Sequence, residues 1–252
     1  MRVEADHAGS VPPEHEGHQV KLALSILSQD GPMSPALSAR RAQGTPAALH
    51  ALDVLDSPGT VWSMTPSSAA VVLGSAQKRE SVDDDAADRL GLPLERRRSG
   101  GGLVVVRPGA GLWIDIVIGR DDPRWVDDVS VAAAWVGATW VEALSASGVS
   151  ASVFAGPTIE PDLGRVVCFA GIGVGEVVRN GRKLVGISQR RDRRGARVQC
   201  VVHTAFDAVE TASIVADPAQ RAAIASRLEQ AVATLSPDQA ATAVGALTEQ
   251  LT

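Results

Sequence analysis

The sequence has no tyrosine, few other aromatic residues and only two cysteines, and these shortages exclude several kinds of function. Its 252 residues include five Trp, three Phe and two Cys. Two cysteines cannot build a disulfide framework, and Cys168 and Cys200 lack the close spacing of a zinc site. So few aromatic rings also provide a poor surface for stacking the bases of single-stranded nucleic acid. We therefore expect free thiols and no nucleic-acid partner.

Histidine and positive charge are scarce as well. Three of the five histidines, His7, His15 and His18, lie in a proline- and acid-rich N-terminal stretch, which leaves His50 and His203 for the remainder. This distribution argues against a metal site made of clustered histidines and against a Ser-His-Asp triad. The formal net charge of −5 at pH 7 disfavours general binding to nucleic-acid phosphates. We therefore predict no metal site.

Long apolar runs are absent too. No stretch approaches 18 consecutive apolar residues, and the first thirty residues lack the basic start, apolar core and cleavage site of a secretory signal. Hydrophobic residues nevertheless make up 45% of the chain, which is enough for a core. These properties predict a globular, cytoplasmic protein with no membrane partner.

The chain divides into three predicted parts. Residues 1–46 hold five of the fourteen prolines and show no sustained amphipathic period, so we expect a flexible N-terminal extension in which Met33 is an alternative initiator. A folded domain is predicted over residues 47–235. A separate C-terminal helix is predicted over residues 236–252.

The order of the predicted elements indicates the fold class. Apolar runs between turn residues predict strands at 60–64, 69–74, 103–106, 112–118, 165–170, 176–178 and 198–206, the first two as a pair. Helices are predicted at 46–55, 82–90, 126–146, 218–235 and 237–251. Most strands follow one another without an intervening helix. This order favours an α+β domain with a central mixed, largely antiparallel sheet flanked by helices.

Three consecutive glycines form the most informative motif. Gly100, Gly101 and Gly102 follow the basic run 96–98 and Ser99, and they precede a predicted strand. Glycines allow the backbone to approach a ligand and expose N–H groups to phosphate or carboxylate oxygens. The segment is neither a Walker loop, since no Lys-Ser or Lys-Thr follows, nor a Rossmann fingerprint, since no helix follows. The alternative is a glycine-rich hairpin turn.

A second motif places one lysine in a basic segment. Lys183 lies between Gly181 and a short apolar stretch that ends at Gly186. Such a lysine can bind an anionic intermediate as a point charge, or it can be solvated in a hairpin. Eight basic residues and one acidic residue between Arg179 and Arg197 give a local charge of +7. This asymmetry favours an anionic ligand or an acidic partner.

Together these motifs resemble the lipoate–protein ligase and octanoyltransferase family of the biotin/lipoate ligase catalytic-domain superfamily. Residues 96–102 are similar to the family's Arg-Arg-x-Ser-Gly-Gly-Gly motif, and residues 181–186 to its Gly-Arg-Lys segment. Trp62 and residues 72–77 precede them in the same order and spacing. The resemblance spans residues 47–235 and implies a catalytic domain with a central mixed sheet.

The resemblance also implies roles for individual residues. Lys183 would hold carbonyl or phosphate oxygens of the activated acyl group. The substrate or adenylate pocket would be lined by Arg97, Ser99, Gly100, Gly101, Gly102 and Gly186. Two positions depart from the family pattern, because Val106 and Cys200 stand where the family usually has histidine.

Cys168 bears on the choice between two branches of this family. In the branch that works through a cysteine thioester, Cys-Phe precedes a Glu-containing strand and then Gly-Arg-Lys, and Cys168, Phe169 and Glu176 resemble that order. A thiolate beside Lys183 would be stabilised and nucleophilic. A cysteine that follows two valines on a strand is also commonly an inert core residue. Both interpretations remain open at this point.

The resemblance favours a lipoate–protein ligase, which would use ATP and Mg²⁺ to form lipoyl-adenylate. Lys183 and the glycine amides would stabilise the developing charge while lipoate is attached to a lysine of an acceptor, a glycine cleavage H protein or an E2 lipoyl domain. The alternative is an octanoyltransferase that moves octanoyl from acyl carrier protein through a Cys168 thioester without ATP, with residues 190–197 docking the acidic carrier. A non-catalytic relative that binds a lipoyl compound is the third hypothesis.

Overall fold

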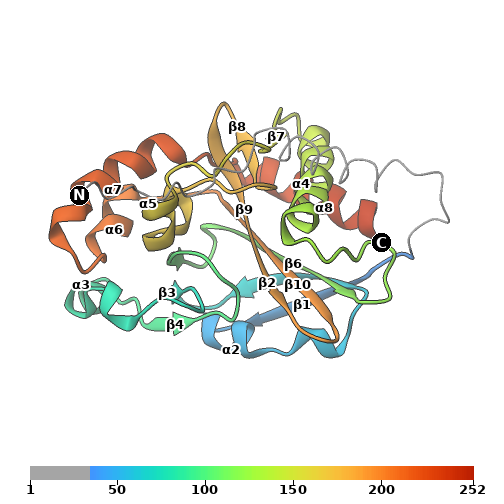
Figure 1. The fold of residues 1–252 in the computed structure, drawn as a ribbon, viewed down its shortest axis with the longest axis horizontal. Coiled ribbons are helices and arrows are strands. Elements are labelled where there is room, and N and C mark those ends of the chain that lie inside the picture. Colours follow the sequence, from blue (N-terminus) through green and yellow to red (C-terminus); the bar gives the residue numbers. More distant parts are fainter. Residues whose placement is uncertain (1–34) are drawn as a thin grey trace, which may run out of the picture.

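Two β-sheets form the framework of the protein in the computed structural model, which describes residues 35–252 (Figure 1). In spatial order, the large sheet contains β1 (Ser38–Gly44), β2 (Thr60–Pro66), β6 (Gly111–Gly119), β10 (Gly195–His203), β9 (Arg182–Arg191), β8 (Val177–Arg179) and β7 (Ser152–Val153). β1 pairs with β2 in parallel, and all other neighbours in this sheet are antiparallel. The predicted α+β fold with a mixed, largely antiparallel sheet is confirmed.

The small sheet carries the glycine motif. Its strands are β4 (Leu94–Arg96), β3 (Ala70–Leu73) and β5 (Val104–Val106), with β3 in the middle. β3 is parallel to β4 and antiparallel to β5. The loop between β4 and β5, which contains the three glycines, therefore starts and ends at the same small sheet.

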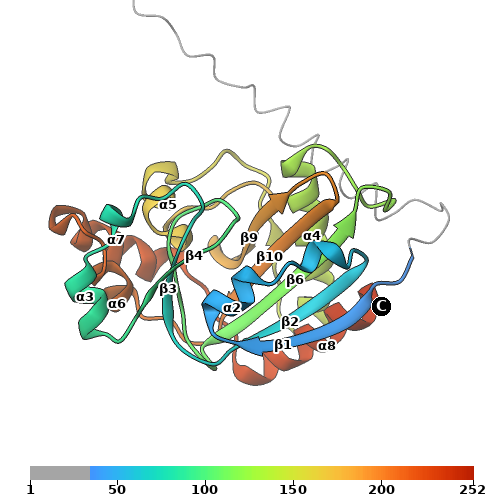
Figure 2. The ribbon, with the colours of Figure 1, turned by 90° about the horizontal axis from the view of Figure 1, so that it is seen from below.

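Helices cover both sheets. The longer ones are α4 (Val129–Ala146), α7 (Pro218–Ala231) and α8 (Pro237–Leu251), and the short ones are α2 (Pro46–Ala51), α3 (Asp84–Arg89), α5 (Pro161–Val166) and α6 (Ala208–Ser213). Three 3₁₀ turns, η1 (Val54–Asp56), η2 (Arg79–Ser81) and η3 (Cys168–Ala170), complete the described elements. α4 and α8 lie on one face of the large sheet, and α2 lies on the other (Figure 2).

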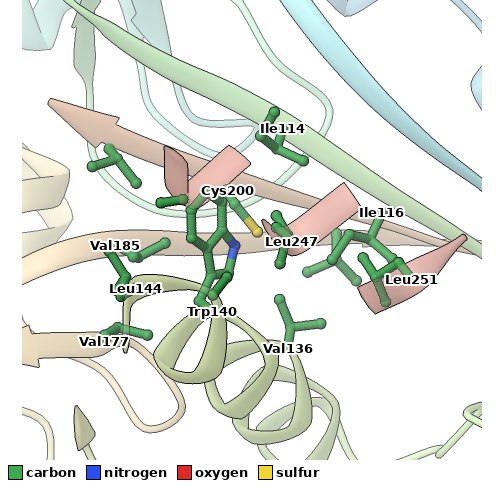
Figure 3. Close-up of a cluster of buried hydrophobic side chains, with 14 of the residues drawn as sticks. Ile114, Ile116, Val136, Trp140, Leu144, Val177, Val185, Cys200, Leu247 and Leu251 are labelled. Atoms are coloured by element: carbon green, nitrogen blue, oxygen red, sulfur yellow. The ribbon is translucent and has the colours of Figure 1, made fainter. Parts of the chain in front are cut away.

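The main core lies between the large sheet and these two helices. Trp140 of α4 points toward Cys200 of β10, while Leu247 and Leu251 of α8 reach the same cluster (Figure 3). By length and composition α4 is apolar enough to cross a membrane, but 67% of it is buried inside the protein, as is typical of a core helix. Asp128 begins this helix by accepting hydrogen bonds from two backbone N–H groups. α8 begins with a capping box at Ser236.

Part of the predicted N-terminal extension is ordered. Ser38–Gly44 forms β1, so the prediction that residues 1–46 are flexible is wrong for this stretch, because backbone pairing with β2 holds it. The other part, residues 1–34 with Met33, lies outside the described residues. The predicted C-terminal helix corresponds to α8, and its Leu247 and Leu251 pack in the core of the large sheet.

Two strand predictions are also wrong. The runs at 60–64 and 69–74 do not pair with each other: β2 belongs to the large sheet and β3 to the small one. The run at 165–170 is not a strand but the end of α5 followed by η3. Its strand-like pairing among residues 35–252 is limited to one isolated bridge between Leu103 and Val167. Cys168 therefore lies at the start of a tight turn, η3, and not within a strand as predicted.

Candidate active site

Three segments that are distant in the sequence meet beside β9. Cys168 Sγ at the start of η3 lies 3.7 Å from Lys183 Nζ of β9. Leu103, which directly follows the three glycines, binds the Cys168 segment through the backbone: its N–H donates to Val166 O, and its carbonyl accepts from Cys168 N–H, each at 3.0 Å. The fold thus brings together the thiol, the lysine and the glycine motif that the sequence singled out.

Lys183 is a buried cation with several acceptors. Its side chain is 2% exposed, and Nζ lies 2.6 Å from Glu176 Oε1 and 3.0 Å from Cys168 O. Nζ also lies 4.9 Å from the centre of the Phe169 ring. Burial by itself lowers the pKa of Lys183, but the neighbouring Cys168 and Glu176 raise it above its ordinary value. The lysine is therefore held in its charged form.

Glu176 is the counter-ion of this lysine and also a structural tie. Its Oε1 accepts a hydrogen bond from Ile187 N–H at 3.1 Å, and its Oε2 accepts one from Gly173 N–H at 2.8 Å. The carboxylate thus fixes the 171–175 loop against β9. In the sequence Glu176 enters only through the resemblance, as the acidic residue of the predicted strand before the Gly-Arg-Lys segment, and it was not among the predicted site residues.

Arg97 holds the glycine loop from inside. Its guanidinium donates to Val72 O at 3.2 Å and to Gly100 O and Gly102 O at 2.8 Å each. Burial lowers the pKa of Arg97, and nearby Cys168 acts in the opposite direction. These bonds occupy the guanidinium with backbone carbonyls. Arg97 therefore fixes the shape of the glycine loop. The resemblance implied a different role, in which Arg97 lines the substrate pocket.

Ser99 links the loop to the large sheet. Its hydroxyl donates to Gln199 Oε1 of β10 at 2.6 Å and accepts from Ser188 Oγ of β9 at 3.1 Å. The residue is almost fully buried. Gln199, one of the two residues found where the family usually has Gln-His, is thus used to anchor the loop.

Two glycines allow the close approach of these segments. A Cβ at Gly102 would lie 2.5 Å from Gly164 O and 2.7 Å from Cys168 N, so any larger residue would push the cysteine away. A Cβ at Gly186 would lie 3.0 Å from the Phe169 ring and 3.2 Å from Lys183 Cε. Glycine at these positions lets the loop, η3 and β9 pack directly on one another.

The thiol lies at the boundary of two hollows. An open cleft of about 610 Å³ is lined by residues that include Gly100, Gly101, Cys168, Gly171, Glu176, Lys183 and Ser188. A small apolar cavity of about 40 Å³ is lined by residues that include Val72, Arg97, Val104, Val106, Cys168, Phe169, Gly186 and Val201. Cys168 lines both and is half-buried. It can therefore present sulfur to a group in the cleft while an apolar chain lies on its other side.

The second cysteine is unsuited to chemistry. Cys200 is fully buried in the core of the large sheet near Trp140 (Figure 3). Burial raises the pKa of Cys200 to about 12, and the charge of Asp115 adds to the effect. Its thiol remains protonated at physiological pH, so Cys168 is the one candidate nucleophile of the pair.

The basic segment is largely occupied by internal partners. Arg191 donates to Val126 O at 2.7 Å, Arg197 pairs with buried Asp115 at 2.6 Å, and Arg194 pairs with Asp192 at 2.7 Å. The local charge of +7 that suggested a docking surface is thus partly neutralised within the fold.

The site residues do not fit a protein-held Mg²⁺. Within residues 35–252 no group of three or more His, Cys, Asp or Glu side chains could hold a metal ion. Of the described residues that line the cleft, Glu176 is the only carboxylate, and both of its oxygens are engaged. Magnesium sites usually combine one or two protein carboxylates with substrate phosphates.

Comparison with known proteins shows which family shares this sequence pattern. Residues 47–244 match the family described as the lipoyl protein ligase A/B catalytic domain. No curated protein matches the chain.

Several solved structures share the fold. Protein Ta0514 of Thermoplasma acidophilum with bound lipoic acid is 19% identical, with a TM-score of 0.61 over 87% of this chain and 86% of its own. A bipartite lipoate protein ligase of the same organism, described with its E2 lipoyl domain, is 19% identical, with a TM-score of 0.60 over 86% and 84%. A lipoate-protein ligase A bound with ATP gives the same identity and TM-score over 86% of each chain.

Proposed function

Because the chain belongs to the lipoyl protein ligase A/B catalytic-domain family, we propose that it transfers an octanoyl or lipoyl group to a lysine of an acceptor protein through a thioester on Cys168. The observation that carries this proposal is the 3.7 Å separation of Cys168 Sγ and Lys183 Nζ. A neighbouring cation stabilises a thiolate, and the thiolate is the nucleophilic form of cysteine. The sequence favoured an ATP-dependent ligase, and this geometry shifts the preference to the transferase.

In the first step the Cys168 thiolate attacks the carbonyl carbon of an acyl thioester on a carrier. A new carbon–sulfur bond forms to Cys168, and the carrier leaves as its own thiolate, so no ATP is consumed. The tetrahedral oxyanion that develops between these events lies in the cleft. Backbone N–H groups of Gly100 and Gly101, together with the Lys183 ammonium, are the donors that would stabilise it.

In the second step the neutral amine of the acceptor lysine attacks the Cys168 thioester. An amide bond forms, the carbon–sulfur bond breaks, and the proton released by the amine passes to the departing sulfur or to water. Lys183 again compensates the negative charge on sulfur. The acceptor is a lipoyl-domain protein, an E2 lipoyl domain or a glycine cleavage H protein, because a ligase of similar fold is described together with its E2 lipoyl domain.

The second candidate function is the ligase that the sequence favoured. The size of the cleft, about 610 Å³, and the similar fold of an ATP-bound lipoate-protein ligase support it. In this case lipoate and ATP are the substrates, Lys183 holds the adenylate oxygens, and Cys168 takes no part in bond formation. Mg²⁺ would arrive on the phosphates of ATP, since the cleft offers it no free carboxylate.

The test is intact-mass analysis of an apo lipoyl domain incubated with the full chain. One reaction contains octanoyl carrier protein without ATP, and the other contains lipoate, ATP and Mg²⁺. Each is repeated with Cys168→Ser and with Cys200→Ser as the matched control. We expect an octanoyl gain on the acceptor without ATP, an acylated enzyme intermediate, and loss of both only with Cys168→Ser.

Other outcomes would contradict this proposal. A lipoyl gain that needs ATP and survives Cys168→Ser would establish the ligase. A folded protein that binds lipoate but modifies no acceptor in either reaction would support the non-catalytic hypothesis.

A further inference from the structure

A second, larger cavity lies next to the small apolar cavity that Cys168 lines. It has a volume of about 320 Å³ and is lined by residues that include Leu112, His203, Phe206, Arg107 and Glu210. The two cavities share three lining residues, Val106, Trp113 and Val201. These three side chains therefore form the partition between the cavity at Cys168 and the larger one beyond it.

The volumes of the two cavities indicate which of them can hold an acyl chain that is attached to Cys168. One water-sized group needs about 10–15 Å³ of cavity volume. The cavity of about 40 Å³ at Cys168 therefore has room for about three water-sized groups. An octanoyl chain of eight carbons does not fit there. The cavity of about 320 Å³ has room for a longer chain, and much of its lining is apolar.

We infer that the acyl chain on Cys168 passes between Val106 and Trp113 into the larger cavity, and that the protein therefore also accepts saturated acyl groups of twelve or more carbons. This inference rests on the proposed function, because it needs an acyl group held at Cys168. It identifies a substrate class, medium- to long-chain acyl thioesters, and a residue that sets their length.

Of the three partition residues, Val106 is the one that controls the passage. Trp113 is fixed because its Nε1 donates to Asp115 Oδ1 at 2.8 Å and its ring packs on His50 with centroids 4.3 Å apart. Val201 is fixed opposite Trp113 in the pairing of β10 with β6. Val106 ends β5, where it pairs with Ala70, and it is the one partition residue that belongs to the small sheet, so a larger side chain there would narrow the gap between the two sheets.

Part of the lining of the larger cavity lies at the protein surface. Arg107 and Glu210, which line it, form an ion pair of 2.8 Å, and their side chains are 35% and 26% exposed. The rest of the wall includes Leu112, Phe206 and the buried ring of His203. An extended acyl chain would thus contact apolar side chains over most of its length and would meet water near Arg107 and Glu210. Carbons added at that point would change the binding free energy little.

The experiment measures acylation of Cys168 by intact mass, using butyryl, octanoyl, dodecanoyl and hexadecanoyl thioesters of one carrier. The full chain is compared with Val106→Phe, which narrows the passage, and Leu112→Trp, which fills the larger cavity. Val209→Phe is the matched control, because Val209 is 63% exposed and lies outside both cavities. Thermal unfolding verifies that each variant is folded.

We expect the unmodified chain to accept dodecanoyl at a rate within tenfold of octanoyl. Val106→Phe should lower the ratio of dodecanoyl to butyryl transfer at least tenfold, and it should lower the ratio of octanoyl to butyryl transfer by a smaller factor. Leu112→Trp should lower mainly the ratio of hexadecanoyl to butyryl transfer. Equal ratios in all variants, or no dodecanoyl transfer by the unmodified chain beside ready octanoyl transfer, would overturn this inference alone. Failure of every thioester to acylate Cys168 would instead contradict the proposed function.

Discussion

Lys183 and Glu176 form a buried ion pair that joins chemistry to stability. Their nitrogen and oxygen lie 2.6 Å apart, with side chains 2% and 8% exposed. A buried charge that loses its partner remains desolvated, and such a change costs about 3–5 kcal/mol, whereas removal of both charges costs far less. Each charge of the pair therefore needs the other in the folded protein, and Glu176 also balances the cation that lies next to Cys168.

A double-mutant cycle tests this coupling. We expect Glu176→Gln and Lys183→Met each to lower the free energy of unfolding by about 3 kcal/mol, measured by urea denaturation. The double variant should lose at least about 1 kcal/mol less than the sum of the two. Glu210→Gln, in the partly exposed pair with Arg107, is the control and should change stability by less than about 1 kcal/mol. Additive losses at positions 176 and 183 would show that the two charges do not stabilise each other.

At the scale of elements, the glycine loop is held at one side by η3 and open at the other. Gly102 contacts the backbone of Gly164 and Cys168, while a Cβ at Gly100 would meet nothing within 4 Å. The two glycines belong to one motif but have different surroundings. Alanine at the two positions therefore separates the effect of tight packing, which applies to Gly102, from the loss of backbone freedom, which applies to both.

We predict that Gly102→Ala destabilises the protein by about 1–3 kcal/mol, because the added methyl group overlaps backbone atoms that must move. It should also slow Cys168 alkylation or acylation, since the displaced atoms belong to that residue. Gly100→Ala should stay within about 1 kcal/mol of the unmodified chain. Urea denaturation and iodoacetamide labelling followed by mass analysis are the measurements. A Gly100→Ala loss as large as that of Gly102→Ala would contradict the packing explanation.

Local sequence patterns predicted most elements but not their partners. The helix at 126–146 and the strands at 112–118 and 198–206 were recognisable because their apolar residues are buried in the main core. β1 was missed because its side chains are mostly exposed and its stability comes from backbone pairing with β2. The valines at 166–167 favoured a strand, yet α5 begins at Pro161 and continues to Val166.

The candidate site shows the same limit. The motifs around Gly100 and Lys183 could be found in the sequence because residue type and order carry them. The contact of Cys168 with Lys183 depends on the β9 pairing and on η3, which no local pattern specifies. The roles of Glu176 and Val106 likewise depend on which segments surround them, so they became visible only in the fold.

For the whole molecule, two buried histidines that line the cavities near Cys168 link folding to pH. Burial, with the charges of Arg197 and Arg97, lowers the pKa of His50 to about 3. Burial and the charge of Lys183 lower that of His203 to about 4, from an ordinary value of 6.5. Both rings are packed against aromatic side chains, His50 on Trp113 and His203 on Phe169. The folded protein therefore keeps both neutral where an unfolded chain would protonate them.

This difference predicts acid sensitivity with a definite sign. Below pH 6.5 the unfolded chain binds more protons than the folded one, so the free energy of unfolding falls as pH decreases, by up to about 1.4 kcal/mol per pH unit for each histidine. The fall continues until pH approaches about 4 for His203 and about 3 for His50. Urea denaturation between pH 7.5 and 5 measures it in a range where most carboxylates remain ionised. His203→Phe keeps a ring against Phe169 but cannot be protonated. It should reduce the slope of unfolding free energy against pH by the contribution of one histidine, up to about 1.4 kcal/mol per pH unit. An unchanged slope in this variant would mean that His203 takes up its proton without unfolding, and that its cavity tolerates a charge.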